Sequence, residues 1–261
     1  MRTLVIATAV VALLAGCTAA PVTIEPSPTV ESLSKPTDDA RTPATVCADD
    51  ALAGTSRWTG ADGAWFETGV VGEGETVAVF IPQSGSDYCG FIDFALVLAG
   101  HGIQSVLLNL CGVGTTVCGL EDNVVSSGAR AALVAAEQAR ADGAARVVVV
   151  GASMGGTTAI VAASLSDGDG PLDAVADLSG PIEFAGIDTA PLAADVAIPM
   201  FLAVSGNDSV VTADELDQLG AASAGKDYTV YGGSGHGWAM LLTREGTPTE
   251  TGKALVDFVV G

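Results

Sequence analysis

The chain has 261 residues, 49% of them hydrophobic, and its 10 Lys and Arg stand against 31 Asp and Glu, a formal net charge of −21. This length suits one large domain with a sizeable core. Such an acidic balance argues against nucleic acid and anionic lipid head groups as partners.

The first residues are organised like a bacterial export signal. Residues 1–3 form a short basic start, and residues 4–14 are mostly apolar and uncharged. That run is too short for a membrane-spanning helix, which needs roughly 20 residues. Leu14-Ala15-Gly16-Cys17 resembles the bacterial lipobox, in which the cysteine is lipidated and becomes the mature N-terminus. A plain secretory signal, cleaved near Ala15, Ala19 or Ala20, is the alternative.

Residues 17–46 predict a tether rather than part of the fold. Prolines stand among Thr, Ser, Asp and Glu without a helical or alternating pattern, so this segment cannot bury enough apolar surface to fold. We therefore expect a signal peptide over residues 1–16, a disordered tether over 17–46 and a folded domain over 47–261. The protein would be exported and held on the outer face of the cell membrane by acyl chains on Cys17, because two chains anchor stably where one is marginal.

The cysteines beyond Cys17 predict two disulfides, because an even count in an exported chain favours pairing. Sequence alone leaves three pairings open. Cys111 and Cys118 would close a short, glycine-containing loop, so we favour that pair, with Cys47 and Cys89 forming the other. A metal site is the alternative. It has weak support, because the sequence holds no Cys-x-x-Cys pair and only two histidines.

Predicted strands and helices alternate from residue 65 onward, the order of a doubly wound, mostly parallel α/β sheet. Apolar, β-branched runs mark the strands, and alanine- or leucine-rich segments mark the helices. The expected strands are 65–71, 76–82, 103–110, 147–150, 172–178, 200–205 and 228–231. The expected helices are 89–99, 124–141, 157–163, 213–222 and 253–259.

The chain is organised around the valine run 147–150 and the Gly151-Ala152-Ser153-Met154-Gly155-Gly156 segment that follows it. Four consecutive valines are typical of a strand buried on both faces. Strand, sharp turn and helix form the context in which Gly-x-Ser-x-Gly presents a nucleophilic serine. We expect a strained backbone at Ser153, with Gly151 and Gly155 removing clashes around it and Gly156 letting the helix lie close to the sheet. An incidental serine in a glycine-rich turn is the alternative.

Across residues 50–261 the chain resembles the α/β-hydrolase fold, in which the triad serine, acid and histidine follow in that order. Residues 200–211 are similar to the acid segment of that family, a strand and a short turn with Asp208 shortly before two valines. Residues 232–238 are similar to its histidine loop and contain His236. Both segments follow predicted strands, so both side chains are expected at the sheet edge that carries Ser153.

Two other residues compete for the acid and base roles. Asp177 lies near the end of a predicted strand, where some hydrolases carry the acid, but the turn at Asp208 matches the family more closely. His101 precedes a strand, which puts it at the opposite edge of the sheet, so His236 is the expected base.

An oxyanion hole requires two backbone N–H groups. Met154, directly after the nucleophile, would supply one. The other is expected from the loop after strand 76–82, where Gln83-Ser84-Gly85-Ser86 replaces the His-Gly of many relatives. Ser86 is the first choice for this donor and Ser84 the second.

The resemblance implies a small hydrolase without a large cap domain. Only residues 179–199 separate two predicted strands where many hydrolases insert a cap, although Phe184, Ile187 and Leu192 could form a small flap. A short, capless chain resembles the dienelactone hydrolase or small carboxylesterase branch. Dienelactone hydrolases proper use a cysteine nucleophile, and Ser153 departs from that.

Together these features predict a monomeric serine hydrolase of the cell envelope that cleaves small carboxylic esters with Ser153, His236 and Asp208 and without a metal or organic cofactor. A peptidase, thioesterase or acyltransferase on the same triad is the first alternative. A binding lipoprotein that keeps the fold without activity is the second.

Overall fold

The computed structural model describes residue 47 and residues 56–61, 64–118, 123–166, 170–223, 230–231 and 233–261. The predicted signal peptide, the predicted lipidation site Cys17 and the predicted tether lie outside these residues. No helix in the described part of the chain is both long and apolar enough to cross a membrane.

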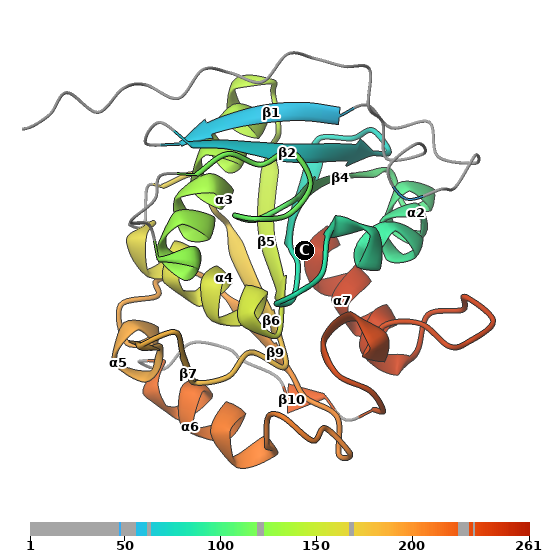
Figure 1. The fold of residues 1–261 in the computed structure, drawn as a ribbon. Coiled ribbons are helices and arrows are strands. Elements are labelled where there is room, and N and C mark those ends of the chain that lie inside the picture. Colours follow the sequence, from blue (N-terminus) through green and yellow to red (C-terminus); the bar gives the residue numbers. More distant parts are fainter. Residues whose placement is uncertain are drawn as a thin grey trace, which may run out of the picture. The chain divides into compact units, whose positions relative to one another are not determined.

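An eight-stranded sheet forms the centre of the domain (Figure 1). The first two strands in sheet order pair antiparallel with each other, and the second is also antiparallel to the third. The remaining strands run parallel to one another, which confirms the predicted mostly parallel α/β architecture. In sheet order the strands are β1 (Ser56–Ala61), β2 (Ala64–Val71), β4 (Ile103–Leu108), β3 (Thr76–Ile81), β5 (Arg146–Ala152), β6 (Ala174–Leu178), β9 (Met200–Ala203) and β10 (Val230–Tyr231).

Helices cover both faces of this sheet, as a doubly wound fold requires (Figure 1). On one face lie α3 (Val124–Ala141), α4 (Met154–Leu165) and α6 (Ala213–Ala222). On the other lie α2 (Ile92–Gly100) and α7 (Glu250–Val260).

Strand β5 shows why the sheet is central to the core. Val147 and Val149 belong to the apolar cluster under α3 and α4, whereas Val148 and Val150 belong to the cluster under α2 and α7. All four side chains are 0% exposed. The valine run is thus buried on both faces, as its composition predicts.

The structure adds one strand to the central sheet and divides one helix. β1 is not predicted, because its short, glycine-containing sequence pairs only with β2 at the edge of the sheet. The helix predicted over 89–99 starts as the 3-10 turn η1 (Tyr88–Phe91), capped by Asp87, before α2 begins. Strands β4, β6 and β9 are each two residues shorter than predicted.

The segment between β6 and β9 holds no cap domain. Within residues 179–199, two strands of two residues each, β7 (Glu183–Phe184) and β8 (Ile187–Asp188), form a hairpin. The single-turn helix α5 (Ala190–Ala193) follows it. Phe184 and Ile187, expected as part of a small flap with Leu192, pack with it against the core cluster under α3 and α4. The absence of a large insertion agrees with the prediction, and the three apolar side chains are used in packing.

Candidate active site

The carboxyl ends of the parallel strands meet at one edge of the sheet, where open α/β sheets place their sites. The loop 82–87 follows β3, Ser153 follows β5, Ser179 follows β6, and residues 204–211 follow β9. The loop with His236 follows β10. All the sequence-predicted triad residues are therefore carried by this edge.

Ser153 occupies a strained turn between β5 and α4. Its backbone has φ 53° and ψ −123°, a conformation that non-glycine residues rarely adopt. A Cβ added to Gly151 would lie 1.8 Å from Gly155 O, and one added to Gly155 would lie 2.2 Å from Ile81 O. The predicted strain at Ser153 and the predicted need for both glycines are confirmed. Ser153 remains 9% exposed, at the N-terminus of α4.

Asp208 and His236 form a direct hydrogen bond. The distance from His236 Nδ1 to Asp208 Oδ2 is 2.8 Å, with the Asp208 side chain 0% exposed and the His236 side chain 25% exposed. The other carboxylate oxygen accepts from Val210 N at 2.8 Å and from Val211 N at 3.1 Å. Burial by itself would raise the pKa of Asp208, but the hydrogen bonds outweigh it and lower that pKa below its ordinary value. Asp208 is therefore an ionised acceptor for the imidazole.

The residues on either side of His236 hold its loop in place. The Ser205 hydroxyl donates to Gly235 O, while Gly235 N donates to Asn207 Oδ1 at 3.2 Å. Gly237 has φ 58°, and a Cβ built there would lie 3.1 Å from Ala152 Cβ and 3.8 Å from Ser153 N. The histidine loop thus lies directly against the turn that carries Ser153.

Asp177, the rival acid, is separate from this pair. Its Oδ1 accepts from Gly180 N at 2.6 Å, and its Oδ2 is buried with no hydrogen-bond partner among the described residues. Burial raises the pKa of Asp177 to about 7, and the hydrogen bond from Gly180 only partly opposes it. A Cβ on Gly156 would lie 2.0 Å from Asp177 Oδ1, so Gly156 lets α4 approach the sheet at this carboxyl, as predicted.

The loop after β3 distinguishes the two expected oxyanion donors. Ser86 N donates to Gln83 O at 3.3 Å and so closes the turn. The N–H of Ser84 takes no part in that bond. Met154, the first residue of α4, has its N–H in the first helical turn, where backbone donors lack partners within the helix.

Comparison with known proteins identifies the family. A model of the dienelactone hydrolase family matches residues 115–253, more than half of the chain. The chain belongs to the dienelactone hydrolase family. A dienelactone is a cyclic ester, and this family member is accordingly an α/β-hydrolase that acts on ester bonds. No curated protein sequence matches it significantly.

Solved structures agree on the fold of this dienelactone hydrolase family member. An esterase from Pyrococcus furiosus aligns with a TM-score of 0.67 at 12% identity, over 89% of this chain and 98% of that one. A hydrolase from Thermoplasma acidophilum, described as predicted and CIB-like, aligns at 0.61 and 16% identity, over 80% and 98%. Est1E from Butyrivibrio proteoclasticus, with ferulic acid bound, aligns with a TM-score of 0.60 at 12% identity, over 78% of this chain and 96% of that one. These likenesses confirm the α/β-hydrolase fold.

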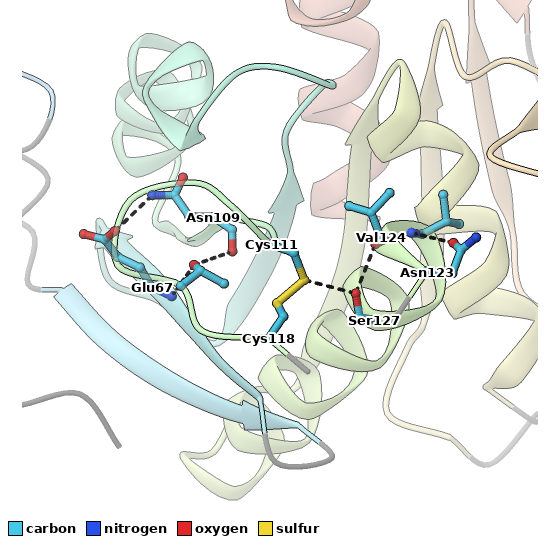
Figure 2. The surroundings of a disulfide bond; sticks show 9 residues. Glu67, Asn109, Cys111, Cys118, Asn123, Val124 and Ser127 are labelled. Atoms are coloured by element: carbon cyan, nitrogen blue, oxygen red, sulfur yellow. Dashed lines mark hydrogen bonds between the residues drawn. A yellow bond between two sulfur atoms is a disulfide. The ribbon is translucent and has the colours of Figure 1, made fainter. Parts of the chain in front are cut away.

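Both favoured disulfides are present in this family member, Cys47–Cys89 and Cys111–Cys118. Figure 2 shows the second pair closing the loop after β4, with Cys111 Sγ 3.3 Å from the Ser127 hydroxyl of α3. The metal-site alternative for the four cysteines is therefore wrong.

A buried polar network, not predicted from the sequence, holds the same loop (Figure 2). Glu67 Oε2 accepts from Asn109 Nδ2 at 3.3 Å and from Thr115 N at 2.9 Å. Asn109 Oδ1 accepts from Tyr88 N at 2.9 Å, which links the loop after β4 to η1. A glutamate in the middle of a predicted, otherwise mostly apolar strand was the available signal, because a carboxylate that becomes buried there needs hydrogen-bond donors.

The second histidine, His101, takes no part in the site. His101 is exposed and lies at the C-terminal end of α2, the edge of the sheet opposite Ser153. Within the described parts of the chain, no three His, Cys, Asp or Glu side chains gather as metal ligands would.

Proposed function

We propose that this protein is a serine carboxylesterase of the cell envelope with Ser153, His236 and Asp208 as its catalytic triad. The observation that carries the proposal is the 2.8 Å hydrogen bond from His236 to Asp208 in a loop packed against the strained Ser153 turn. Only Asp208, of the two acids considered, contacts His236, which supports its assignment over Asp177.

The reaction follows from these positions. His236 accepts the Ser153 proton while Ser153 Oγ attacks the ester carbonyl carbon, and the ionised Asp208 stabilises the imidazolium. His236 then protonates the leaving alcohol as the bond between the carbonyl carbon and the alcohol oxygen breaks. Water, deprotonated by His236, attacks the acyl-enzyme and releases the carboxylic acid with Ser153 restored.

Backbone N–H groups of Met154 and Ser84 would bind the oxyanion. Met154 N lies at the start of α4, where the helix dipole also favours negative charge. Ser86, the first choice from the sequence, has its N–H engaged in the turn with Gln83, so the structure shifts our proposal to Ser84.

A fluorophosphonate probe tests the nucleophile. We expect the probe to label wild-type protein and p-nitrophenyl acetate to be hydrolysed, and we expect Ser153→Ala and His236→Ala to lose both properties. His101→Ala is the matched control, because it removes the other histidine of the chain. Labelling that persists in Ser153→Ala would contradict the proposal. Rates on esters, thioesters and anilides would distinguish an esterase from a thioesterase or a peptidase. Adding a competing alcohol acceptor would reveal transferase activity.

The envelope location is proposed from the sequence of residues 14–17 and is tested separately. Wild-type protein should fractionate with membranes and carry acyl chains on Cys17, whereas Cys17→Ser should be neither lipidated nor cleaved at that site. An unmodified mature N-terminus beyond residue 17 would contradict the anchor and would leave the triad unaffected.

A further inference from the structure

Ser179 lies at the active edge and, like Ser153, has a positive φ. It directly follows β6, is 0% exposed and has φ 60°. A non-glycine residue in the left-handed region is strained and persists only where its surroundings determine it.

The chain around Ser179 is fixed on both sides. Ser179 N donates to Ala203 O at 2.8 Å, across to β9, and Gly180 N donates to Asp177 Oδ1 at 2.6 Å. The turn between these two bonds therefore has little freedom, and it sets the direction in which the Ser179 hydroxyl points.

This hydroxyl joins the two partners of the triad pair. Its oxygen accepts from Gly237 N at 3.3 Å, next to His236, and the hydroxyl is near enough to the Asp208 carboxylate to help lower the pKa of that group. A single serine hydroxyl, which can both accept and donate, thus lies between the acid and the backbone of the histidine loop.

We infer that Ser179 is a positioning residue for the triad, whose hydroxyl holds Asp208 and the His236 loop in the geometry required for proton transfer from Ser153. The inference rests on the proposed function. Without the hydroxyl, Gly237 N loses its acceptor and the Asp208 carboxylate loses a nearby polar group that favours its charged form, so the imidazole is held less firmly. Ser179 itself need not touch the substrate.

Two substitutions separate the effect of losing the Ser179 hydroxyl from the effect of relieving the backbone strain. Ser179→Ala removes the hydroxyl and keeps a residue that disfavours φ 60°, whereas Ser179→Gly removes the hydroxyl and relieves that strain. Ser223→Ala is the matched control. Ser223 is also buried, its hydroxyl donates to Gly220 O at 2.7 Å, and it follows α6, away from the active edge.

We expect kcat on p-nitrophenyl acetate to fall about ten- to hundredfold in both Ser179 variants, the range for losing one hydrogen bond to a charged group. KM should change far less, because the geometry lost is needed in the transition state. The acidic limb of kcat/KM should move to higher pH, because a less stabilised Asp208 carboxylate attracts the imidazole proton more strongly. Ser179→Gly should unfold at a higher temperature than Ser179→Ala and be no more active.

A proton NMR measurement tests the inference without substrate. The His236 Nδ1 proton, deshielded by its carboxylate partner, should give a far-downfield signal that is absent in Asp208→Asn and shifted or broadened in both Ser179 variants. An unchanged signal together with wild-type kcat, or a loss of kcat no larger than that of Ser223→Ala, would overturn the inference. If Ser153→Ala retains full esterase activity, the proposed function fails, and the NMR result still decides whether Ser179 holds His236 and Asp208 together.

Discussion

Two buried carboxyl groups on neighbouring strands have opposite environments. Asp177 lies in β6, and Asp208 follows β9, which pairs with β6. Asp208 accepts hydrogen bonds from two backbone N–H groups and pairs with His236, whereas Asp177 accepts one hydrogen bond from Gly180 N. The pKa of Asp208 is lowered and that of Asp177 is raised to about 7. Asp177 is the more deeply buried of the two and has fewer donors, and both differences favour Asp208 as the anionic acid of a triad.

The largest expected effect is on activity. Asp208→Asn should lower kcat by about 10³- to 10⁴-fold, because an amide stabilises neither the required imidazole tautomer nor its cation. Asp177→Asn should lower kcat far less, since Asp177 does not contact His236. Steady-state kinetics on one soluble ester measure both. An equal loss in the two variants would show that the contrast between the carboxyls has no catalytic meaning.

The next effect is on the pH dependence of stability. Burial raises the pKa of Asp177 from 3.8 to about 7, so the folded protein binds this proton more tightly than the unfolded chain does. Its contribution to the free energy of unfolding should therefore fall as pH rises from about 4 to about 7, by an amount on the order of a few kcal/mol. Denaturant titrations at several pH values should show a shallower decline for Asp177→Asn than for wild type.

Asp217→Asn is the control for that measurement, because it removes an exposed carboxylate from the middle of α6. It should leave the wild-type decline nearly unchanged. If Asp177→Asn also leaves it unchanged, Asp177 does not carry a strongly raised pKa in the folded protein.

A smaller effect is expected from adding one methyl group beside each carboxyl. A Cβ on Gly156 would lie 2.0 Å from Asp177 Oδ1 and 2.9 Å from Gly180 Cα, whereas one on Gly206, near Asp208, meets nothing within 4 Å. Gly156→Ala should therefore cost about 1–3 kcal/mol of unfolding free energy. Gly206→Ala should change it by no more than about 0.5 kcal/mol. Equal stability of the two variants would show that the space around Asp177 is not tight.

The smallest effect concerns acyl-chain length. With no cap in residues 179–199, few methylenes of a substrate can be buried, and each would contribute only about 0.8 kcal/mol. Short p-nitrophenyl esters should react best, without a jump in rate when long esters aggregate. Neither carboxyl contacts the acyl chain in our proposal, so Asp177→Asn should keep the wild-type profile. A preference for palmitate would reveal a lipid-binding surface.

The features that the sequence predicts well depend on residues that are close to one another along the chain. The clash that a Cβ on Gly151 would make with Gly155 involves residues only four positions apart, so the strained serine turn can be recognised from residues that are close along the chain. The turns that carry Asp208 and His236 follow strands at the same sheet edge, and their order in the chain brings them to Ser153. The buried sheet follows similarly from apolar runs.

The supporting contacts could not be predicted, because their partners are distant in sequence. The bond between Gly237 N and the Ser179 hydroxyl joins residues 58 positions apart, and that between Gly235 N and Asn207 joins residues 28 apart. Nothing in the local sequence of a serine after a strand indicates that its hydroxyl will lie near an acid from another loop. The engagement of Ser86 N in a turn likewise depends on backbone angles that Gly85 permits but does not dictate.

The Cys47–Cys89 disulfide also determines how the domain would respond to mechanical load. A force applied through the residues before Cys47 would pass to Cys89 across the disulfide, so β1, β2 and β3 would carry no tension. The segment enclosed by the disulfide, with a sequence separation of 42, corresponds to roughly 140 Å of extended chain. Force could extend this segment only after the disulfide is reduced. The strand that leads into the Gln83–Ser84 loop would thus be shielded when the protein is stretched from its N-terminal side.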